Sequence, residues 1–454
     1  MRCRQREDES ALPFSLPNVR LFIAFRIFFN ARFYYPVFTI LFLDYGLTLE
    51  QFAILNAVWA ATIVLVEVPS GALADTLGRR RLLLLSGFLM VLEMVLMAFA
   101  PRGPSGWLFP FFLVNRVLSG TAEASASGAD EALAYDSLKA AGLAREWGRV
   151  LEHQIRWQAG AFMAASLVGA AVYDPALMQR VAAFVGFNQP MEQTVTMRFP
   201  VYLTLAMAVA ALATAWRMSE PDCAGPQAAD GIKGCGRPVA DAIRLTFRAG
   251  VWIVKTPFAL VVILGGLLFD HVIRMILTLN SQYYRLIELP EAGFGLIGAA
   301  MAAVGLFAPR AAAGLALRCS PRCIFALLAG ATILGLAGMT LFVPVYGVAP
   351  MLLLIGVMYV FNFFLSHYLN RITASEQRAT VLSFKGLSFN LAYGMLGLVY
   401  SAGLAAARRF GTGEDALFPH SIGWFPWYFL VAMTAFLLLS SRRLRGVDIH
   451  KLPG

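Results

Sequence analysis

Charged side chains occur inside long apolar runs of this chain, where ionisable groups are rare. The first run contains Arg26, Asn30 and Arg32, and the next two contain Glu67 and Glu93. A charged side chain at the depth of a lipid bilayer costs about 3 kcal/mol or more, so each one requires a partner, a wet cavity or a function. The chemistry open to these groups is ion pairing, exchange of a proton and binding of a charged molecule.

The fourth apolar run is the most polar and carries several acids together with a base. Its polar members are Asn115, Arg116, Glu123, Asp130, Glu131 and Asp136. A carboxylate close to an arginine stays ionised until a proton or a ligand competes for it. We therefore expect a proton site around Arg116, with Glu67, Glu93, Glu123 and Asp130 as the candidate carboxylates.

The second half of the chain adds another set of polar residues at membrane depth. Asp270 and Arg274 are four residues apart, a helical spacing that lets them neutralise one another, whereas Lys385 has no acid nearby in the sequence. A site containing more cations than acids would favour anionic or zwitterionic molecules. The candidate binding residues are Arg26, Asn30, Arg32, Asp270, Arg274, Asn362, Lys385 and Asn390. Of the cations among them, we expect Arg26 and Lys385 to be unpaired.

The composition identifies the class of protein that must position these residues. Hydrophobic residues make up 59% of the chain and charged residues 14%, against roughly 45–50% and 25% in soluble domains. The net charge of +10 is explained by cationic loops on one side of a membrane, so nucleic acid is not an expected partner. The five Cys residues are scattered, which argues against a metal site. We expect an all-α polytopic membrane protein without a cofactor.

Twelve apolar segments are long enough to cross a bilayer as helices. They lie near residues 19–43, 51–75, 82–100, 107–137, 149–174, 197–217, 256–283, 293–317, 323–343, 348–370, 380–405 and 422–441. Lys and Arg gather in the loops of one side, which predicts that both termini are cytoplasmic. The polar start of the chain lacks the pattern of a removable signal peptide, so the first segment should remain as a span.

The longest hydrophilic break separates six expected spans from six. It divides the chain into an N-terminal half (1–217), a cytoplasmic linker (218–255), a C-terminal half (256–441) and a tail (442–454). Gly and Pro punctuate residues 218–238, so we expect this part to be poorly packed. The periodicity of residues 239–254 predicts an amphipathic helix at the membrane interface.

The loop between the second and third segments carries the most specific pattern in the chain. Residues 71–81 read Gly-Ala-Leu-Ala-Asp-Thr-Leu-Gly-Arg-Arg-Arg. This stretch resembles the loop 2–3 signature of the major facilitator superfamily, secondary transporters with two pseudo-symmetric six-helix halves. The resemblance implies a gating motif at the cytoplasmic side, with Asp136 as an expected ion-pair partner for the arginines. Its residues here are Gly71, Asp75, Gly78, Arg79, Arg80 and Asp136. Asp75 is expected to latch the outward-facing state.

Two stretches of the fourth segment extend the resemblance. Residues 116–120, Arg-Val-Leu-Ser-Gly, resemble the Arg-x-x-Gln-Gly element of proton-coupled members, which implies a coupling role for Arg116. The alternative is that Arg116 pairs with Glu93 or Glu123 and simply holds helices together. Residues 128–138 resemble the end of this span in a bacterial branch of the superfamily.

These patterns predict a transporter rather than an enzyme or a receptor. No Gly-x-x-x-x-Gly-Lys-Ser/Thr element is present, so an ion gradient, most simply of protons, would drive transport of a small anionic or zwitterionic solute. The alternative is efflux of amphipathic compounds by proton antiport, although the Gly-x-x-x-Gly-Pro stretch of drug antiporters is missing from the fifth segment. The expected setting is the inner membrane, as a monomer in contact with lipid, substrate and the coupling ion.

Overall fold

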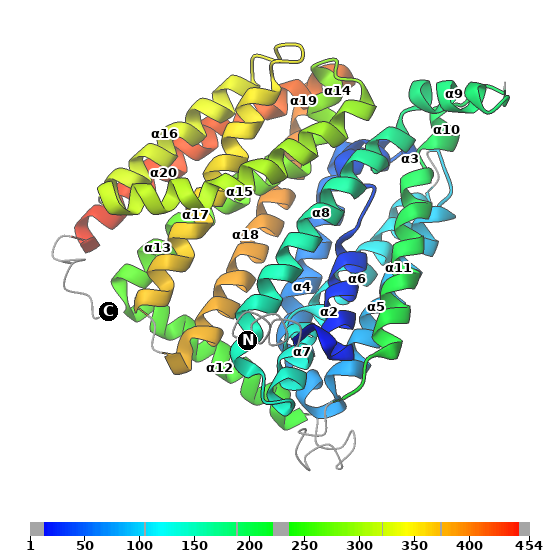
Figure 1. Cartoon of the computed structure of the whole chain (residues 1–454). Helices are drawn as coiled ribbons and strands as arrows, with labels where there is room; N and C mark the ends of the chain where they lie inside the picture. The colour runs from blue at the N-terminus through cyan, green and yellow to red at the C-terminus, as the bar shows by residue number, and fades with distance from the viewer. Residues whose placement is uncertain are drawn as a thin grey trace, which may run out of the picture. The chain divides into compact units, whose positions relative to one another are not determined.

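The computed structural model describes residues 13–103, 106–187, 189–220, 236–319, 321–372 and 375–444, and Figure 1 shows their arrangement. Within these residues every regular element is a helix, which confirms the predicted all-α class. Nine of the described helices are long and apolar enough to cross a membrane. They span Leu49–Ala74, Arg79–Ala98, Ala144–Tyr173, Gln193–Arg217, Pro257–Thr278, Glu291–Leu315, Val348–Ser366, Val381–Arg409 and Glu414–Ser440. Of the other three predicted spans, those near 19–43 and 107–137 are each divided between two helices, and the one near 323–343 corresponds to an apolar helix that ends at Met339.

Contacts between residues divide the chain into two compact units. Unit 1 comprises residues 1–36 and 62–243, and unit 2 comprises residues 37–61 and 244–454. The short segment 37–61 therefore packs with the second half of the sequence. The six-plus-six division of the chain predicted above remains a prediction.

Unit 1 is a bundle of helices around a core of Phe, Leu and Ala side chains. Its elements are α2 (Pro17–Asn30), the later part of α4 (Leu49–Leu77), α5 (Arg79–Ala98), α6 (Leu108–Ala126), α7 (Ala129–Ala140), η2 (Ala144–Glu146), α8 (Trp147–Tyr173), α9 (Pro175–Phe184), α10 (Gln193–Thr196) and α11 (Phe199–Arg217). Helix α5 packs against α6 and α11, while α2 packs against α7, α8 and α11. These contacts bring the first and fourth apolar segments of the sequence together.

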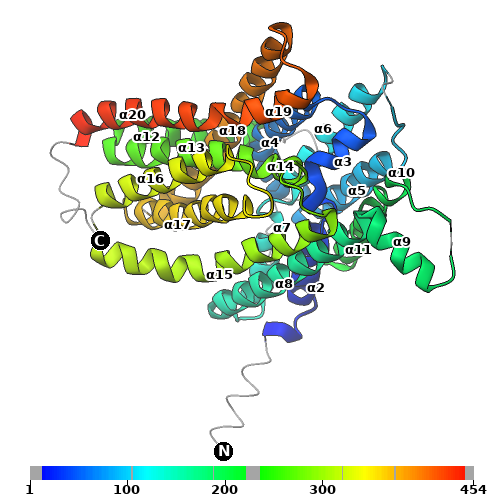
Figure 2. The ribbon, with the colours of Figure 1, turned by 90° about the horizontal axis from the view of Figure 1, so that it is seen from above.

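Unit 2 is a second helical bundle, and its helices can be followed in Figure 2, which shows the whole chain from above. Its elements are α3 (Phe38–Tyr45), the first part of α4, the later part of α12 (Gly236–Lys255), α13 (Pro257–Thr278), α14 (Asn280–Leu286), η5 (Glu291–Gly293), α15 (Phe294–Arg318), α16 (Pro321–Met339), α17 (Val348–Ile372), α18 (Ser375–Arg409), α19 (Glu414–Ile422) and α20 (Trp424–Leu444). Helix α13 is central, because it packs against α17, α18 and α20.

An arginine fastens α3 to the rest of unit 2. Arg285 on α14 donates from Nη1 and Nη2 to the two carboxylate oxygens of Asp44 at 2.9 Å each, and from Nε to Glu291 at 3.1 Å. Burial lowers the pKa of this guanidinium, but the hydrogen bonds and charges of Asp44 and Glu291 outweigh burial and raise it above its ordinary value. The guanidinium of Arg285 therefore stays charged, and its hydrogen bonds to Asp44 hold α3 in place.

The first predicted span is wrong as a single helix, because the chain unwinds in its middle. Helix α2 ends at Asn30, residues 31–34 are non-helical, and the 3-10 helix η1 (Tyr35–Val37) leads into α3. Pro36 explains the break: it has no N–H, and it disfavours the α conformation of the preceding residue. Irregular backbone at membrane depth is tolerated only where protein buries it or where it lines a wet cavity.

The unwound segment is buried against α8 and α11. The backbone N–H of Phe33 donates to Thr204 Oγ1 at 3.0 Å, which replaces the helical hydrogen bond lost at the break. The carbonyl of Phe33 approaches Gly169 so closely that a Cβ there would lie 1.8 Å from the oxygen. Only glycine at position 169 permits this approach.

Gly169→Ala should therefore destabilise the protein by displacing the unwound segment, at a cost of about 1–3 kcal/mol for overpacking. Gly160→Ala on the same helix is the matched control, because nothing lies within 4 Å of the added Cβ. Thermal unfolding in detergent should show a lower midpoint for Gly169→Ala and an unchanged or higher one for the control. Equal midpoints would contradict this account of the break.

The fourth predicted span, 107–137, is also divided in the structure. Helix α6 ends at Ala126, and Gly128 adopts a left-handed conformation with φ of 76° before α7 begins at Ala129. Glycine takes this conformation without the steric cost that a Cβ would add. The break lets α7 turn independently of α6 and presents Asp130 and Glu131 in the first turn of α7.

The linker lies mostly outside the described residues, which omit 221–235. Its first residues are packed, contrary to the prediction of a poorly packed segment from 218 onward. Met218 is buried. The side-chain amide of Asn18 donates to the carbonyl of Ser219, and its oxygen accepts the backbone N–H of Ser219. The predicted amphipathic helix at 239–254 is present as α12.

Candidate functional site

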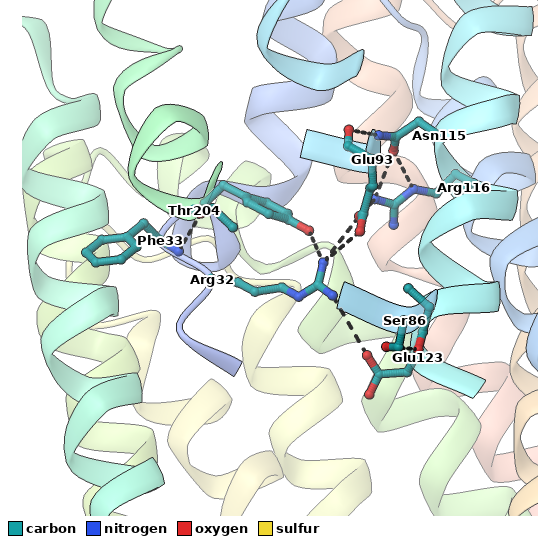
Figure 3. Close-up of polar contacts among 10 residues, drawn as sticks. Arg32, Phe33, Ser86, Glu93, Asn115, Arg116, Glu123 and Thr204 are labelled. Carbon is teal, nitrogen blue, oxygen red and sulfur yellow. Dashed lines mark hydrogen bonds and ion pairs between the residues drawn. The ribbon is translucent and has the colours of Figure 1, made fainter. Parts of the chain in front are cut away.

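A buried cluster of four charged side chains lies where the broken first segment meets α5 and α6 (Figure 3). It consists of Arg32, Glu93, Arg116 and Glu123. Arg32 Nη1 donates to both carboxylate oxygens of Glu93 at 3.2 Å, and Arg116 Nη2 lies 3.7 Å from Glu93 Oε1. On its other side, Arg32 Nη2 lies 3.9 Å from Glu123 Oε2.

Burial distinguishes Glu123 from the other members of the cluster. The side chains of Arg32, Glu93 and Arg116 are at most 4% exposed, whereas that of Glu123 is 43% exposed. Two guanidinium groups therefore share one fully buried carboxylate, and a second carboxylate at the accessible edge completes the charge balance. Removing one partner of a buried ion pair leaves an uncompensated buried charge, which is strongly destabilising. The charge of Glu123 therefore matters to the whole cluster.

Neutral side chains hold the cluster in place. Tyr34 OH accepts a hydrogen bond from Arg32 Nη1 at 3.1 Å. Asn115 donates to the backbone carbonyl of Glu93 at 2.8 Å and accepts from Arg116 Nε at 3.4 Å. These groups fix the arginines without adding charge, which is how a buried network becomes specific in its geometry.

Arg26 is paired, which corrects the prediction that it is a free cation. Its Nε lies 2.6 Å from Asp130 Oδ2, and its Nη2 donates to Glu131 Oε1 at 2.7 Å. The break at Gly128 places these two acids in the first turn of α7, facing α2. The side-chain amide of Asn30 donates to the backbone carbonyl of Arg26, one turn earlier on α2, at 2.8 Å.

Glu67 on α4 is the remaining candidate carboxylate of unit 1. It is partly buried, and its carboxylate forms no ion pair within the part of the chain that the structure describes. The Ser70 hydroxyl one turn later donates to the carbonyl of Ala124 on α6 at 2.8 Å, which fixes this part of α4 beside α6.

The gating motif contains the expected ion pair between Arg79 and Asp136. Arg79 also donates to the carbonyl of Ala132 on α7 at 2.9 Å, so α5 and α7 are tied at this end of unit 1. The side chain of Asp75, which was expected to act as the latch, lies outside what the structure describes. Gly71 is exposed and has nothing within 4 Å of an added Cβ.

Glu220 is a residue of this region that the sequence did not reveal. Its carboxylate accepts the backbone N–H of Arg80 at 2.7 Å, at the start of α5, where a negative charge is favourable. Gly78 makes room for it with φ of 96°, and a Cβ at that position would lie 2.8 Å from Glu220 Oε1. The Arg80 side chain donates to the Trp216 carbonyl at 2.9 Å. The first residues of the linker are thus fastened to the gating loop.

Unit 2 has a smaller polar cluster between α13 and α18. Arg274 Nη2 lies 2.5 Å from Asp270 Oδ2, the predicted i, i+4 pair, and Nη1 donates to Asn390 Oδ1 at 2.8 Å. The guanidinium also lies over the ring of Tyr393, with its carbon 5.3 Å from the ring centroid. Arg274 is therefore paired with groups of its own unit.

Lys385 is the other predicted binding cation of unit 2, and, unlike Arg274, it packs against an aromatic ring instead of pairing with any acid that the structure describes. Its Nζ lies 5.5 Å from the centroid of the Phe389 ring, and no carboxylate within the described residues lies within ion-pair distance of it. Asn362 is partly buried on α17 and has no hydrogen bond to the other predicted residues of the part described. His271 is buried beside Asp270, and its Nε2 lies 2.8 Å from the hydroxyl of Tyr428.

The sequence of the chain matches a profile of the Major Facilitator Superfamily over residues 20–397. The chain belongs to this superfamily. The predicted resemblance is thereby confirmed, and the chain is an integral membrane protein of a transporter superfamily. A search of curated proteins gives no match to it.

Solved structures of superfamily transporters share its fold. The nucleoside transporter NupG is 13% identical, with a TM-score of 0.68 over 93% of this chain and 98% of NupG. A bacterial homolog to the human lysosomal transporter Spinster, in an inward-facing and occupied conformation, is 14% identical, with a TM-score of 0.66 over 95% of this chain and 97% of the homolog. A D-xylose-proton symporter is 13% identical, with a TM-score of 0.61 over 92% of this chain and 96% of the symporter. At these identities the likeness establishes the fold.

Many secondary transporters are built from repeated helical units and bind their substrates near the middle of the bilayer, often beside discontinuous helices. The break at residues 31–34 is a feature of this kind, and the buried cluster lies directly beside it. This position makes the cluster of unit 1 the leading functional candidate.

Proposed function

We propose that the chain is a secondary active transporter that couples the movement of protons to that of a small anionic or zwitterionic solute by alternating access. The observation that carries the proposal is the buried cluster, in which Arg32 and Arg116 share Glu93 and depend on the half-exposed Glu123 for neutrality. The likeness in fold to a protein named as a D-xylose-proton symporter supports proton coupling.

Protonation of Glu123 would change the charge of this cluster. Arg32 and Arg116 would then face the single carboxylate of Glu93, leaving a net positive charge in a site of low dielectric constant. An anion entering beside Glu123 restores neutrality and is attracted more strongly there than in water. Proton binding and anion binding thus favour one another, which is the requirement for symport.

Lys385 in unit 2 is proposed as a contact for the substrate anion. Because Arg274 is engaged by Asp270 and Asn390, Lys385 is the cation with the greater freedom to bind a ligand. An ammonium group attracts a carboxylate or phosphate as a point charge and accepts several orientations of the partner.

Export of amphipathic cations by proton antiport is the alternative. It is favoured by the excess of acids over bases inside the apolar runs of unit 1, where Glu67 carries no ion pair among the described residues and Arg26 is held by two acids. A cationic compound would then compete with protons for these carboxylates. The two functions differ in the charge of the solute and in the direction of its coupling to protons.

The proposal also covers the orientation of the protein in the membrane, its location and its oligomeric state. Both termini and the gating loop would face the cytoplasm, as the distribution of Lys and Arg predicts. The protein would act as a monomer in the inner membrane, with residues 1–217 and 256–441 as the halves that alternate.

Uptake into proteoliposomes with and without an inwardly directed proton gradient tests the proposal. The panel contains small anionic, zwitterionic, neutral and cationic solutes of similar size. The expected result is gradient-driven accumulation of an anionic or zwitterionic solute. Extrusion of lipophilic cations with no accumulation of anions would replace symport with the antiport alternative.

A further inference from the structure

A short helix outside the predicted spans carries an exposed apolar cluster in unit 1. Helix α9 lies between α8 and α11, and its tip consists of Val181, Phe184, Val185 and Phe187. These side chains are 49%, 94%, 77% and 52% exposed, respectively. Large apolar groups gathered in this way mark a surface that something covers.

The start of α9 is fixed by a strong cap that turns the chain. Asp174 follows α8 directly, and its Oδ1 accepts the backbone N–H groups of Ala176 and Leu177 at 2.8 and 3.0 Å. Pro175 at the first helical position suits this turn. In Figure 1, α9 runs across the end of α8 instead of continuing it.

The end of α9 is equally well defined. Gly186 adopts φ of 86°, and the N–H of Phe187 reaches back to the carbonyl of Ala182 at 2.8 Å, as in a Schellman motif. The returning chain is held by the N–H of Met191, which donates to Gln179 Oε1 at 2.6 Å. The apolar tip is therefore a formed structure that holds its side chains outward.

The position of α9 indicates what covers the tip. Helix α8 is long enough to cross the membrane, so α9 begins where α8 leaves the bilayer, at the end of unit 1 opposite the Arg79–Asp136 pair. Both views show α9 projecting sideways from the other helices of unit 1 (Figures 1 and 2). A helix that runs across the spans at this level lies along the bilayer surface.

The composition of α9 fits a lipid environment. From Pro175 to Phe187 the only polar side chains are those of Gln179 and Arg180, and Arg180 is exposed. Aromatic and aliphatic side chains partition into the boundary between headgroups and acyl chains, and an arginine beside them reaches lipid phosphate.

We propose that α9 is a membrane-surface anchor whose tip, Val181, Phe184, Val185 and Phe187, inserts into the leaflet opposite the gating loop. The ligand of this surface is phospholipid. The inference rests on membership of a membrane-protein superfamily and not on the substrate or coupling proposed above.

Nitroxide labelling of the full chain in phosphatidylcholine–phosphatidylglycerol vesicles tests the anchor. A label at position 184, with the native Cys residues replaced by Ser, is compared with labels at Phe88 and Lys139. Phe88 is an exposed side chain on the membrane helix α5, and Lys139 is an exposed side chain near a loop. Phe184 is 94% exposed, so its replacement removes few contacts and leaves the fold intact.

The expected result is a label at 184 that collides with oxygen more often than with a water-soluble nickel chelate, as at Phe88 and in contrast to Lys139. A label that collides mainly with the chelate would show a tip in water and overturn the proposal. Protection from both reagents would show that protein, and not lipid, covers the tip, which overturns it equally.

Discussion

Replacing Glu123 with Gln should abolish proton-driven accumulation of substrate while leaving exchange of substrate across the membrane intact. The neutral amide leaves Arg32 and Arg116 facing Glu93 alone, which is the charge state that protonation of Glu123 would create. The site would then remain permanently ready for an anion, so binding no longer requires a proton. We expect accumulation under a pH gradient to fall by about tenfold or more, as loss of a coupling energy above 1.4 kcal/mol implies.

Two measurements separate this loss of coupling from general damage. Counterflow in the absence of a gradient should persist in Glu123→Gln, because it requires substrate binding and alternation but no net proton movement. Glu152→Gln is the matched control: its side chain is 58% exposed, and it pairs with Arg156 at 2.7 Å on the surface of α8, where an ion pair contributes little. Normal pH-driven accumulation in Glu123→Gln would contradict the proposed coupling.

The same cluster bears on the two roles that the sequence left open for Arg116. The ion pair expected if Arg116 only holds helices together is present, because Arg116 Nη2 lies 3.7 Å from Glu93 Oε1 and joins α6 to α5. A coupling role is compatible with that contact, since Glu93 is shared with Arg32 and any change at Glu123 reaches Arg116 through it. Both roles therefore act through one set of ion pairs, and only a measurement of coupling distinguishes them.

Hydrophobic length and the loop pattern at residues 71–81 were sufficient to predict the superfamily and most of the helices. These features depend on local composition, which the bilayer constrains strongly. The i, i+4 pair of Asp270 and Arg274 was predictable for the same reason, because helical geometry alone brings the two side chains together.

The breaks in the helices and several contacts between residues far apart in the sequence were not predicted. Pro36 and Gly128 were visible signals, but each lies in an apolar run whose length suggested one continuous helix. The pairing of Arg26 with Asp130 and Glu131 follows from the break at Gly128, which turns α7 toward α2. If the helix is assumed to be unbroken, the side chains after Gly128 point in other directions than they do in α7. The ion-pair partners of Asp130 and Glu131 therefore could not be assigned from the sequence.

Replacing Lys385 with Gln should weaken binding of the transported anion by ~5–150-fold, the equivalent of about 1–3 kcal/mol for one charge-assisted contact. Lys385 is partly buried over the Phe389 ring, so its charge is only partly screened by water. Arg274 is a weaker substitute, because the carboxylate of Asp270 already neutralises its charge and its Nη1 donates to Asn390. Binding of a panel of anionic, neutral and cationic solutes to the purified protein measures the change.

The matched control for this loss is Lys139→Gln, which removes an exposed ammonium in the last turn of α7 and should leave affinity unchanged. Lys385→Arg provides a second comparison, since it retains the charge but alters its shape, and it should recover part of the affinity for anions. Neutral solutes should bind both Gln variants as they bind the original protein, because they gain nothing from a cation at this position. A preference for lipophilic cations that Lys385→Gln leaves unchanged would contradict an anion site and favour cation export through the acidic residues of unit 1.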